Sequence, residues 1–342
     1  MPVSKEKTQL LYEYDKPIIW NISGFGNESE MYLIDNIING LSKFNIKPPI
    51  TSLHGSYSCK YNGGRTALYF NFKNNIKDKI KHFNDLGIGI KLTFSNSEIH
   101  KDTINEEEMR WYLDILNEIK GIGNGIICIN DDFAKEVKKQ YPDLELVASH
   151  VKMEAETRMG VTDTVDYYNS KFDLYDIVVF NTYRAFDDDF LSKINHPEKV
   201  EFIVNHTCTT NCPYAKYHHL LIDKLQKQKI KFNNNINLFR TDPETIEIKK
   251  EIDKLLFECA KIKQENDYDK LIKQTLNRAE INHLNNTFGI NRFKIEGRDL
   301  STSEFNKYLY TYLLNNDSFF DKMLIDYDNL NKKKEEFKSR MC

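Results

Sequence analysis

The sequence predicts an α/β fold of the (β/α)8 type, a TIM-barrel-like domain with a helical insertion. Short stretches of continuously apolar residues recur along the chain, as is typical of strands that are buried on both faces of a parallel sheet. Longer amphipathic stretches lie between them, which is the alternation expected of βα units. About eight such strands in 342 residues fit a closed barrel better than an open doubly wound sheet.

Each predicted strand is bounded by turn-forming or polar residues. In chain order the strands are PIIWNIS, GIGIKLTFS, GIICIN, LELVASH, DIVVFN, EFIVNH, INLFRT and RFKIEG. Helices are expected between them, for example over 106–119, 133–140 and 187–194. The last helix has a clear start, because Ser301 and Glu304 have the spacing of a capping box. The strand pattern further predicts a set of residues buried in parallel strands: Ile126, Ile127, Val147, Val178, Val179, Ile203 and Ile295.

The domain prediction is a single barrel over 1–342 with three additions. The long, Gly-rich segment 51–75 is expected to form an inserted hairpin or a lid over the barrel mouth. The charged segment 242–284 is longer than one crossover needs and is predicted to be a helical insertion, and 329–342 is predicted to be a charged tail.

Composition narrows the class of protein. The formal net charge is -3 and the pI is about 6.3, so no overall basic field favours nucleic acid, although a local basic cleft would be compatible with these values. The apolar runs are too short to cross a bilayer, and the N-terminal stretch lacks the apolar core of a signal peptide. The six cysteines are irregularly spaced, which argues against a disulfide framework. We therefore expect a cytoplasmic protein with no membrane partner.

Polar side chains follow the predicted strands at the point where each strand ends. In a barrel these ends meet at one rim, where active sites form. Asparagine also ends strands and caps helices, so a purely structural role is the alternative for each one. For the set as a whole a polar pocket is expected, with His150 and His206 as catalytic candidates. The substrate-binding candidates are Asn130, Asn181, Asn205 and, from the lid, Arg65.

The stretch FIVNHTCTTNCPYAKYHH, residues 202–219, suggests a metal site. Cys208 and Cys212 lie close enough in sequence to share one ion, and His218 or His219 would supply an imidazole. Two thiolates and one imidazole form a set that accepts zinc and leaves one position open. The alternatives are a reactive thiol pair and inert loop cysteines.

Three stretches resemble the peptidase U32 family of collagenase-like proteases. They are NTFGINRFKIEGRDLSTSEFNKYLYTYLL, GIICINDDFAKEVKKQYPDLELVASHVKM and the cysteine-containing stretch above, and they span about 125–314. The resemblance implies a TIM-like barrel, and either a peptidase or an enzyme that hydroxylates tRNA, ribosomal RNA or a quinone precursor. It also implies an iron–sulfur cluster, with Cys208 and Cys212 as paired ligands. Such a cluster needs about four thiolates, for which Cys259 and Cys59 are the remaining candidates.

The KIEGR element places three charged residues at the last strand. Lys294, Glu296 and Arg298 match the charged residues of this family segment. Because side chains alternate along a strand, Lys294 and Glu296 point the same way. Arg298 would lie at the rim, where its planar fork suits phosphate or carboxylate. We expect all three to be catalytic, and the alternative is an ion pair that orders the closing strand of the barrel.

The leading functional hypothesis is a U32-like barrel enzyme that hydroxylates a nucleic acid, with RNA as its partner and an iron–sulfur cluster or zinc as its cofactor. A U32-type peptidase is the first alternative, and a non-catalytic binding protein on the same barrel is the second. A third is a base-exchange enzyme resembling transglycosylases, for which Asp131 or Asp132 would be the catalytic carboxylate.

Overall fold

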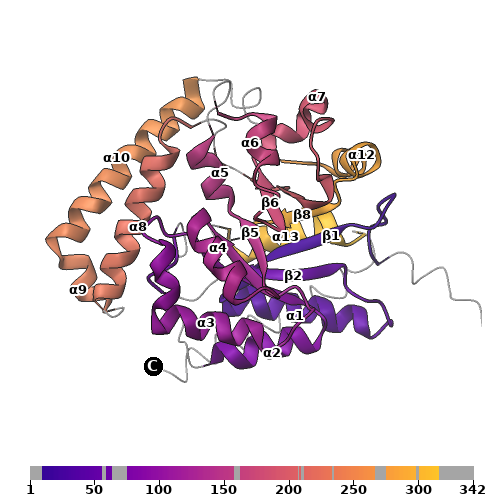
Figure 1. Ribbon diagram of the computed structural model, residues 1–342, viewed down its shortest axis with the longest axis horizontal. Coiled ribbons are helices and arrows are strands. Elements are labelled where there is room, and N and C mark those ends of the chain that lie inside the picture. Colours follow the sequence, from indigo (N-terminus) through magenta and orange to yellow (C-terminus); the bar gives the residue numbers. More distant parts are fainter. Residues whose placement is uncertain are drawn as a thin grey trace, which may run out of the picture.

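Eight parallel strands close into a barrel in the computed structural model (Figure 1). Each strand pairs with the next in sequence, and β8 pairs with β1 to complete the ring. The (β/α)8 fold class predicted from the sequence is therefore confirmed. The structure describes residues 10–55, 59–63, 75–157, 162–206, 208, 212–232, 235–265, 275–297 and 300–315. The strands are β1 Ile19–Phe25, β2 Ile50–Gly55, β3 Gly89–Phe94, β4 Gly125–Cys128, β5 Glu145–Ala148, β6 Ile177–Phe180, β7 Val200–Ile203 and β8 Arg292–Ile295.

Helices surround this barrel. They include α1 Glu28–Ser42, α2 Ile76–Asp85, α3 Glu107–Asn117, α4 Asp131–Gln140, α5 His150–Glu156, α6 Val165–Asn169, α7 Asp188–Leu191, α8 Ala215–Lys231, α9 Ile236–Thr241, α10 Pro243–Glu265, α12 Arg278–Phe288 and α13 Thr302–Leu313. Short 3-10 helices lie at Lys101–Asn105, Thr182–Phe186 and Pro197–Lys199. The capping box predicted at the start of the last helix is confirmed, since Ser301 and Glu304 satisfy each other's backbone N–H at the start of α13. Among the described residues no helix combines the length and apolarity needed to cross a membrane.

Apolar side chains pack between the barrel wall and the helices, and on the β4–β7 side they also fill the interior of the barrel. All seven residues expected in buried parallel strands lie in strands and are at most 1% exposed. On the β4–β7 side, residues that point into the barrel form one small apolar cluster: Ile127, Val147, Ile177, Val179 and Ile203. DIVVFN and EFIVNH pair in parallel, as β6 and β7.

One predicted strand was wrong and one strand was missed, although the number of strands was right. INLFRT is the helix α9, which begins because the Asn235 side chain accepts hydrogen bonds from two backbone N–H groups of its first turn. Its Ile236 and Leu238 are exposed, so its apolar residues are not those of a buried strand. The strand missing from the prediction is β2, which occupies the start of the segment 51–75 that was expected to be an inserted hairpin or lid. Polar Ser52 and His54 alternate with Leu53 in β2, and both polar side chains are buried.

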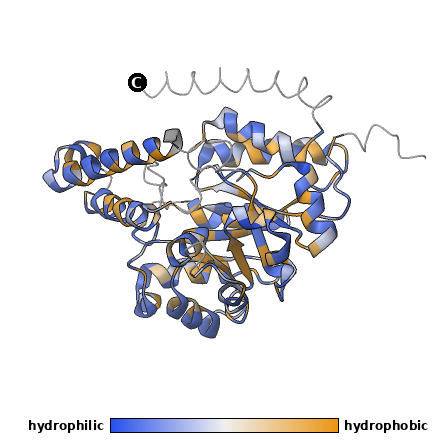
Figure 2. Cartoon of the chain, turned by 90° about the horizontal axis from the view of Figure 1, so that it is seen from above, coloured by the Kyte–Doolittle hydropathy of each residue, from blue (hydrophilic) through white to orange (hydrophobic). Residues whose placement is uncertain are grey.

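A helical arm, formed by α8, α9 and α10, extends from the barrel between β7 and α12 (Figure 1). Seen from above, the arm again projects to one side and carries apolar and polar residues on both of its long helices (Figure 2). Its two ends meet at the rim, because the N–H of Leu276 donates to the carbonyl of Val204 at 2.8 Å and Thr275 pairs with Asn205. The insertion predicted over 242–284 therefore begins earlier, at α8, and α12 is the crossover helix into β8. The predicted tail 329–342 lies outside the described residues.

Candidate metal centre

Two strand ends and one helix bring the candidate site together. β5 ends at Ala148, and the side chain of Ser149 caps α5 by accepting a hydrogen bond from the N–H of Val151 at 3.2 Å. His150 is therefore the first residue of α5, and Glu154 follows one turn later on the same face. His206 lies just beyond β7, two strands along the ring, so its side chain reaches the same rim.

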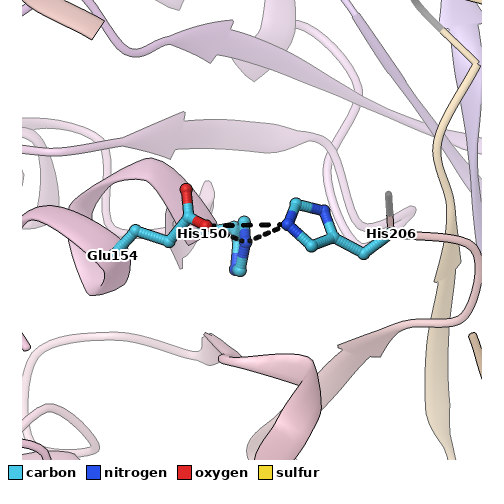
Figure 3. A group of neighbouring side chains, drawn as sticks. All are labelled: His150, Glu154 and His206. Carbon is cyan, nitrogen blue, oxygen red and sulfur yellow. Dashed lines mark hydrogen bonds and ion pairs between the residues drawn. The ribbon is translucent and has the colours of Figure 1, made fainter. Parts of the chain in front are cut away.

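Three ligand atoms from these residues form a compact triangle (Figure 3). The Nε2 atoms of His150 and His206 are 3.2 Å apart, and Oε1 of Glu154 lies 3.4 Å from the first and 3.6 Å from the second. A tetrahedral ion with bonds of about 2.0–2.1 Å holds its ligand atoms about 3.3–3.4 Å apart. Adjacent ligands of an octahedral ion with bonds of about 2.1 Å are about 3.0 Å apart. The triangle thus has the size of one face of a tetrahedral site.

A second layer of side chains contacts two of the three candidate ligands. Oε2 of Glu296 lies 3.3 Å from Nδ1 of His206, and Nε2 of His219, on α8, lies 3.3 Å from Oε2 of Glu154. By contrast, Nδ1 of His150 is buried and has no hydrogen-bond partner among the described residues. Outer partners such as Glu296 and His219 fix the orientation of metal ligands in proteins.

The electrostatics of the cluster favour a cation. Burial alone would raise the pKa of Glu154, but the three neighbouring histidines outweigh it and hold this pKa well below its usual value. The pKa of Glu296 is also lowered, because contact with His206 outweighs its burial. Burial lowers the pKa of His150, whereas hydrogen bonds outweigh burial at His206 and raise its pKa well above the usual value. Two ionised carboxylates therefore lie beside a pair of imidazoles, and the two imidazoles themselves are buried.

The opposite face of α5 is anchored by a buried lysine. The side chain of Lys152 is 2% exposed, and its Nζ lies 3.0 Å from Oδ1 of Asp131 and 3.1 Å from the carbonyl oxygen of Ile129. It also pairs with Glu156, one turn along α5. These contacts tie the helix that carries His150 and Glu154 to the end of β4.

The carboxylates considered for base exchange have other partners. Asp131 binds Lys152 and Lys171 and accepts a hydrogen bond from Tyr175 at 2.7 Å. Burial would raise its pKa, but these contacts outweigh it and lower the pKa to about 2. Asp132 is exposed and pairs with Lys135. Neither carboxylate belongs to the His/Glu cluster.

The three candidate asparagines hold backbone or side-chain groups of the rim. The side chain of Asn130 caps α4. Asn181 donates to Oγ1 of Thr157 at 2.8 Å. Asn205 binds both backbone groups of Glu296, at 2.8 and 2.7 Å. Their part in substrate binding stays a prediction.

The charged residues of the KIEGR element are only partly described. Lys294 is 4% exposed, and its charge contributes to the lowered pKa of Glu296. Glu296 contacts His206, as described above. Arg298 and the lid residue Arg65 lie outside the described residues, so their catalytic and substrate-binding roles stay predictions.

The cysteines form no ligand set of their own among the described residues. Cys208 contributes to the raised pKa of His206. The pKa of Cys212 is raised by burial and also by Cys208, Cys259 and Glu154, so these groups lie within electrostatic range. The ring of His218 stacks against the neighbouring His219. Cys59 is buried in the apolar core, and its thiol donates to Asn62.

Within the part of the chain that the structure describes, only His150, Glu154 and His206 bring three metal-ligating atoms together. Both histidines were predicted from the strand-end pattern, whereas Glu154 was missed. Its signal was the spacing His-x-x-x-Glu directly after a strand, which places two ligands on one face of a helix.

Fold and site together define a parallel eight-stranded α/β barrel protein with a buried His/Glu cluster at its rim. No family model matches the sequence, and no curated protein matches it. Among solved structures the chain is similar to that of the U32 peptidase Mk0906, with 12% sequence identity and a TM-score of 0.43. The likeness covers 71% of this chain and 88% of that one.

Proposed function

We propose that the chain is a metal-dependent hydrolase that holds one zinc ion between His150, Glu154 and His206. The triangle of ligand atoms, with edges of 3.2, 3.4 and 3.6 Å, carries the proposal. Two imidazoles and one carboxylate are a ligand set of catalytic zinc sites, in which a fourth position stays open for water or substrate.

Zinc bound in such a site lowers the pKa of its water and polarises a carbonyl or phosphoryl oxygen. The chain itself contributes the fixed arrangement of the three ligand atoms and their burial away from water. Both histidines are more than nine-tenths buried, so few water molecules compete for the ligand atoms. The ionised Glu154 would offset part of the charge of a bound ion. A hydrolytic role is also compatible with a peptidase, the first alternative from the sequence.

Hydroxylation of a nucleic acid is the second candidate, since the same ligand set suits another metal. Two histidines and one carboxylate also bind iron(II) in oxygenases, as a facial triad. The edges of the triangle range from 3.2 to 3.6 Å, a spread as large as the difference between tetrahedral and octahedral ligand separations, so metal content and not geometry separates the two candidates. An iron–sulfur cluster at Cys208 and Cys212, and RNA as a partner, remain proposals from the family resemblance.

Metal content decides between these candidates. Full-length protein would be loaded separately with zinc and, without oxygen, with iron(II), then dialysed and analysed for bound metal. We expect about one zinc per chain. His206→Ala and Glu154→Ala should lose the bound zinc. The same two variants should also lose the hydrolytic activity that wild type shows on a panel of peptide and phosphate ester substrates.

His82→Ala is the matched control, because His82 forms a histidine–carboxylate pair with Asp35 at 2.9 Å outside the site. This variant should keep its zinc. Stable binding of iron(II) but not zinc would favour hydroxylation. A wild-type chain that retains neither metal, or a His206→Ala chain that binds zinc as tightly as wild type, would overturn the proposed centre.

A further inference from the structure

We infer that Glu296 is a positioning residue of the metal centre, which fixes the His206 ring so that its Nε2 lone pair faces the ion. The inference rests on the proposed function and assigns a role to a side chain that does not itself reach the metal position. Oε2 of Glu296 lies 3.3 Å from Nδ1 of His206, on the far side of the ring from Glu154 and His150.

The first step is the choice of tautomer. An ionised carboxylate only accepts hydrogen bonds, so the nitrogen that faces Glu296 must carry a hydrogen. When the ring is neutral, the other nitrogen, Nε2, is then left with a free lone pair. This is the nitrogen that belongs to the triangle of ligand atoms. Once the ring has lost its second proton, Glu296 therefore favours the tautomer of His206 whose Nε2 can bind a metal.

The second step is the placement of the carboxylate itself. Asn205, which is 3% exposed, accepts a hydrogen bond from the backbone N–H of Glu296 at 2.8 Å. It also donates to the backbone carbonyl of Glu296 at 2.7 Å. Asn205 directly precedes His206 in the chain. The Asn205 side chain therefore links the backbone of Glu296 to the backbone next to His206. The pair is thus aligned before any metal arrives.

The third step is the asymmetry of the cluster. Among the described residues, Nδ1 of His150 has no hydrogen-bond partner, whereas Nδ1 of His206 has Glu296. In the described part of the chain, a carboxylate therefore contacts the Nδ1 atom of one imidazole but not that of the other. Loss of such an outer partner lowers metal affinity by about 10- to 100-fold in other metal centres. We expect the same range here.

The test compares zinc affinities of the full-length chain, measured by competition with a chromophoric chelator. Glu296→Ala should bind zinc about 10- to 100-fold more weakly than wild type. Glu296→Gln keeps an oxygen acceptor but loses the charge, so its affinity should fall by less. Asn205→Ala leaves the carboxylate in place but frees its backbone, and it should also be intermediate.

Glu106→Gln is the matched control. The Glu106 side chain is 38% exposed, close to the 35% of Glu296, and it accepts a hydrogen bond from Tyr61 in another part of the barrel. Its zinc affinity should equal that of wild type. Circular dichroism and thermal melting would show that each variant is folded.

A spectroscopic readout separates positioning from general stability. In zinc-loaded protein with 15N-labelled histidine, the wild-type spectrum should show His206 with a hydrogen on Nδ1 and the metal on Nε2. In Glu296→Ala that Nδ1 hydrogen should exchange faster with water, and in Glu106→Gln it should not.

If wild type binds zinc and Glu296→Ala binds it within twofold, the positioning role is refuted while the metal centre stands. If wild type binds no zinc, the proposed function fails and this inference fails with it. Equal losses in Glu296→Ala and Glu106→Gln would also refute the positioning role, because the effect would then not be specific to the His206 contact.

Discussion

Replacing Lys152 by methionine tests whether α5 is anchored as the structure shows. The side chain of Lys152 is 2% exposed, and its amino group holds Asp131, Glu156 and the carbonyl oxygen of Ile129. Methionine fills a similar volume, so the change removes the charge and its hydrogen bonds with little change in packing.

The expected loss in the free energy of unfolding depends on the two carboxylates that lose the Lys152 amino group. A buried charge that loses its only partner costs about 3–5 kcal/mol. Here Asp131 and Glu156 are 34% and 39% exposed, and both still contact Lys171, at 2.9 and 3.5 Å. Solvent and this remaining cation reduce the penalty. We therefore expect Lys152→Met to lower the free energy of unfolding by about 2 kcal/mol.

The measurement is urea unfolding followed by circular dichroism, with the free energy obtained by linear extrapolation. Lys135→Met is the control, since Lys135 pairs with Asp132 on the exposed surface of α4. It should change the free energy by less than about 0.5 kcal/mol. If the two variants are equally stable, the reasoning about the buried anchor is refuted.

Three further predictions concern single positions. A Cβ on Gly297 would come within 2.4 Å of Oγ of Ser23, so Gly297→Ala should destabilise by about 1–3 kcal/mol in urea unfolding; an unchanged midpoint would contradict the close approach. Ser301→Ala removes the capping box with Glu304 and should lower the free energy of unfolding by about 1 kcal/mol, whereas no change would show that the cap is dispensable. The pKa of Asp131 is lowered to about 2, because its ion pairs and hydrogen bonds outweigh burial. Its unfolded pKa is about 3.9, so its stabilisation is complete above about pH 4 and is lost as the pH falls towards 2. The stability advantage of wild type over Asp131→Asn should shrink over that range in acid unfolding, and a constant difference would refute it.

The strands on the β4–β7 side of the barrel were readily predicted because strands that are buried on both faces consist of apolar residues. Stretches such as GIICIN and DIVVFN are apolar throughout, since one set of side chains faces the helices and the other fills the barrel. β2 did not show this pattern, because its inward positions are polar: His54 contacts Asn21 inside the barrel at 3.0 Å. INLFRT has the composition of a strand, but the cap at Asn235 and exposure to solvent make it a helix.

Some residues of the site could likewise be predicted from the sequence, whereas others were found only in the structure. By itself the sequence determined that polar residues follow buried strands, and this placed His150 and His206 at one rim. It did not single out Glu154, whose role depends on the start of α5 at the Ser149 cap. Nor did it show that Glu296 contacts His206, 90 residues away in the chain, rather than acting mainly with Lys294. Only the closing of the barrel between β7 and β8 decided that contact, because hydrogen bonds between neighbouring parallel strands set which distant residues meet.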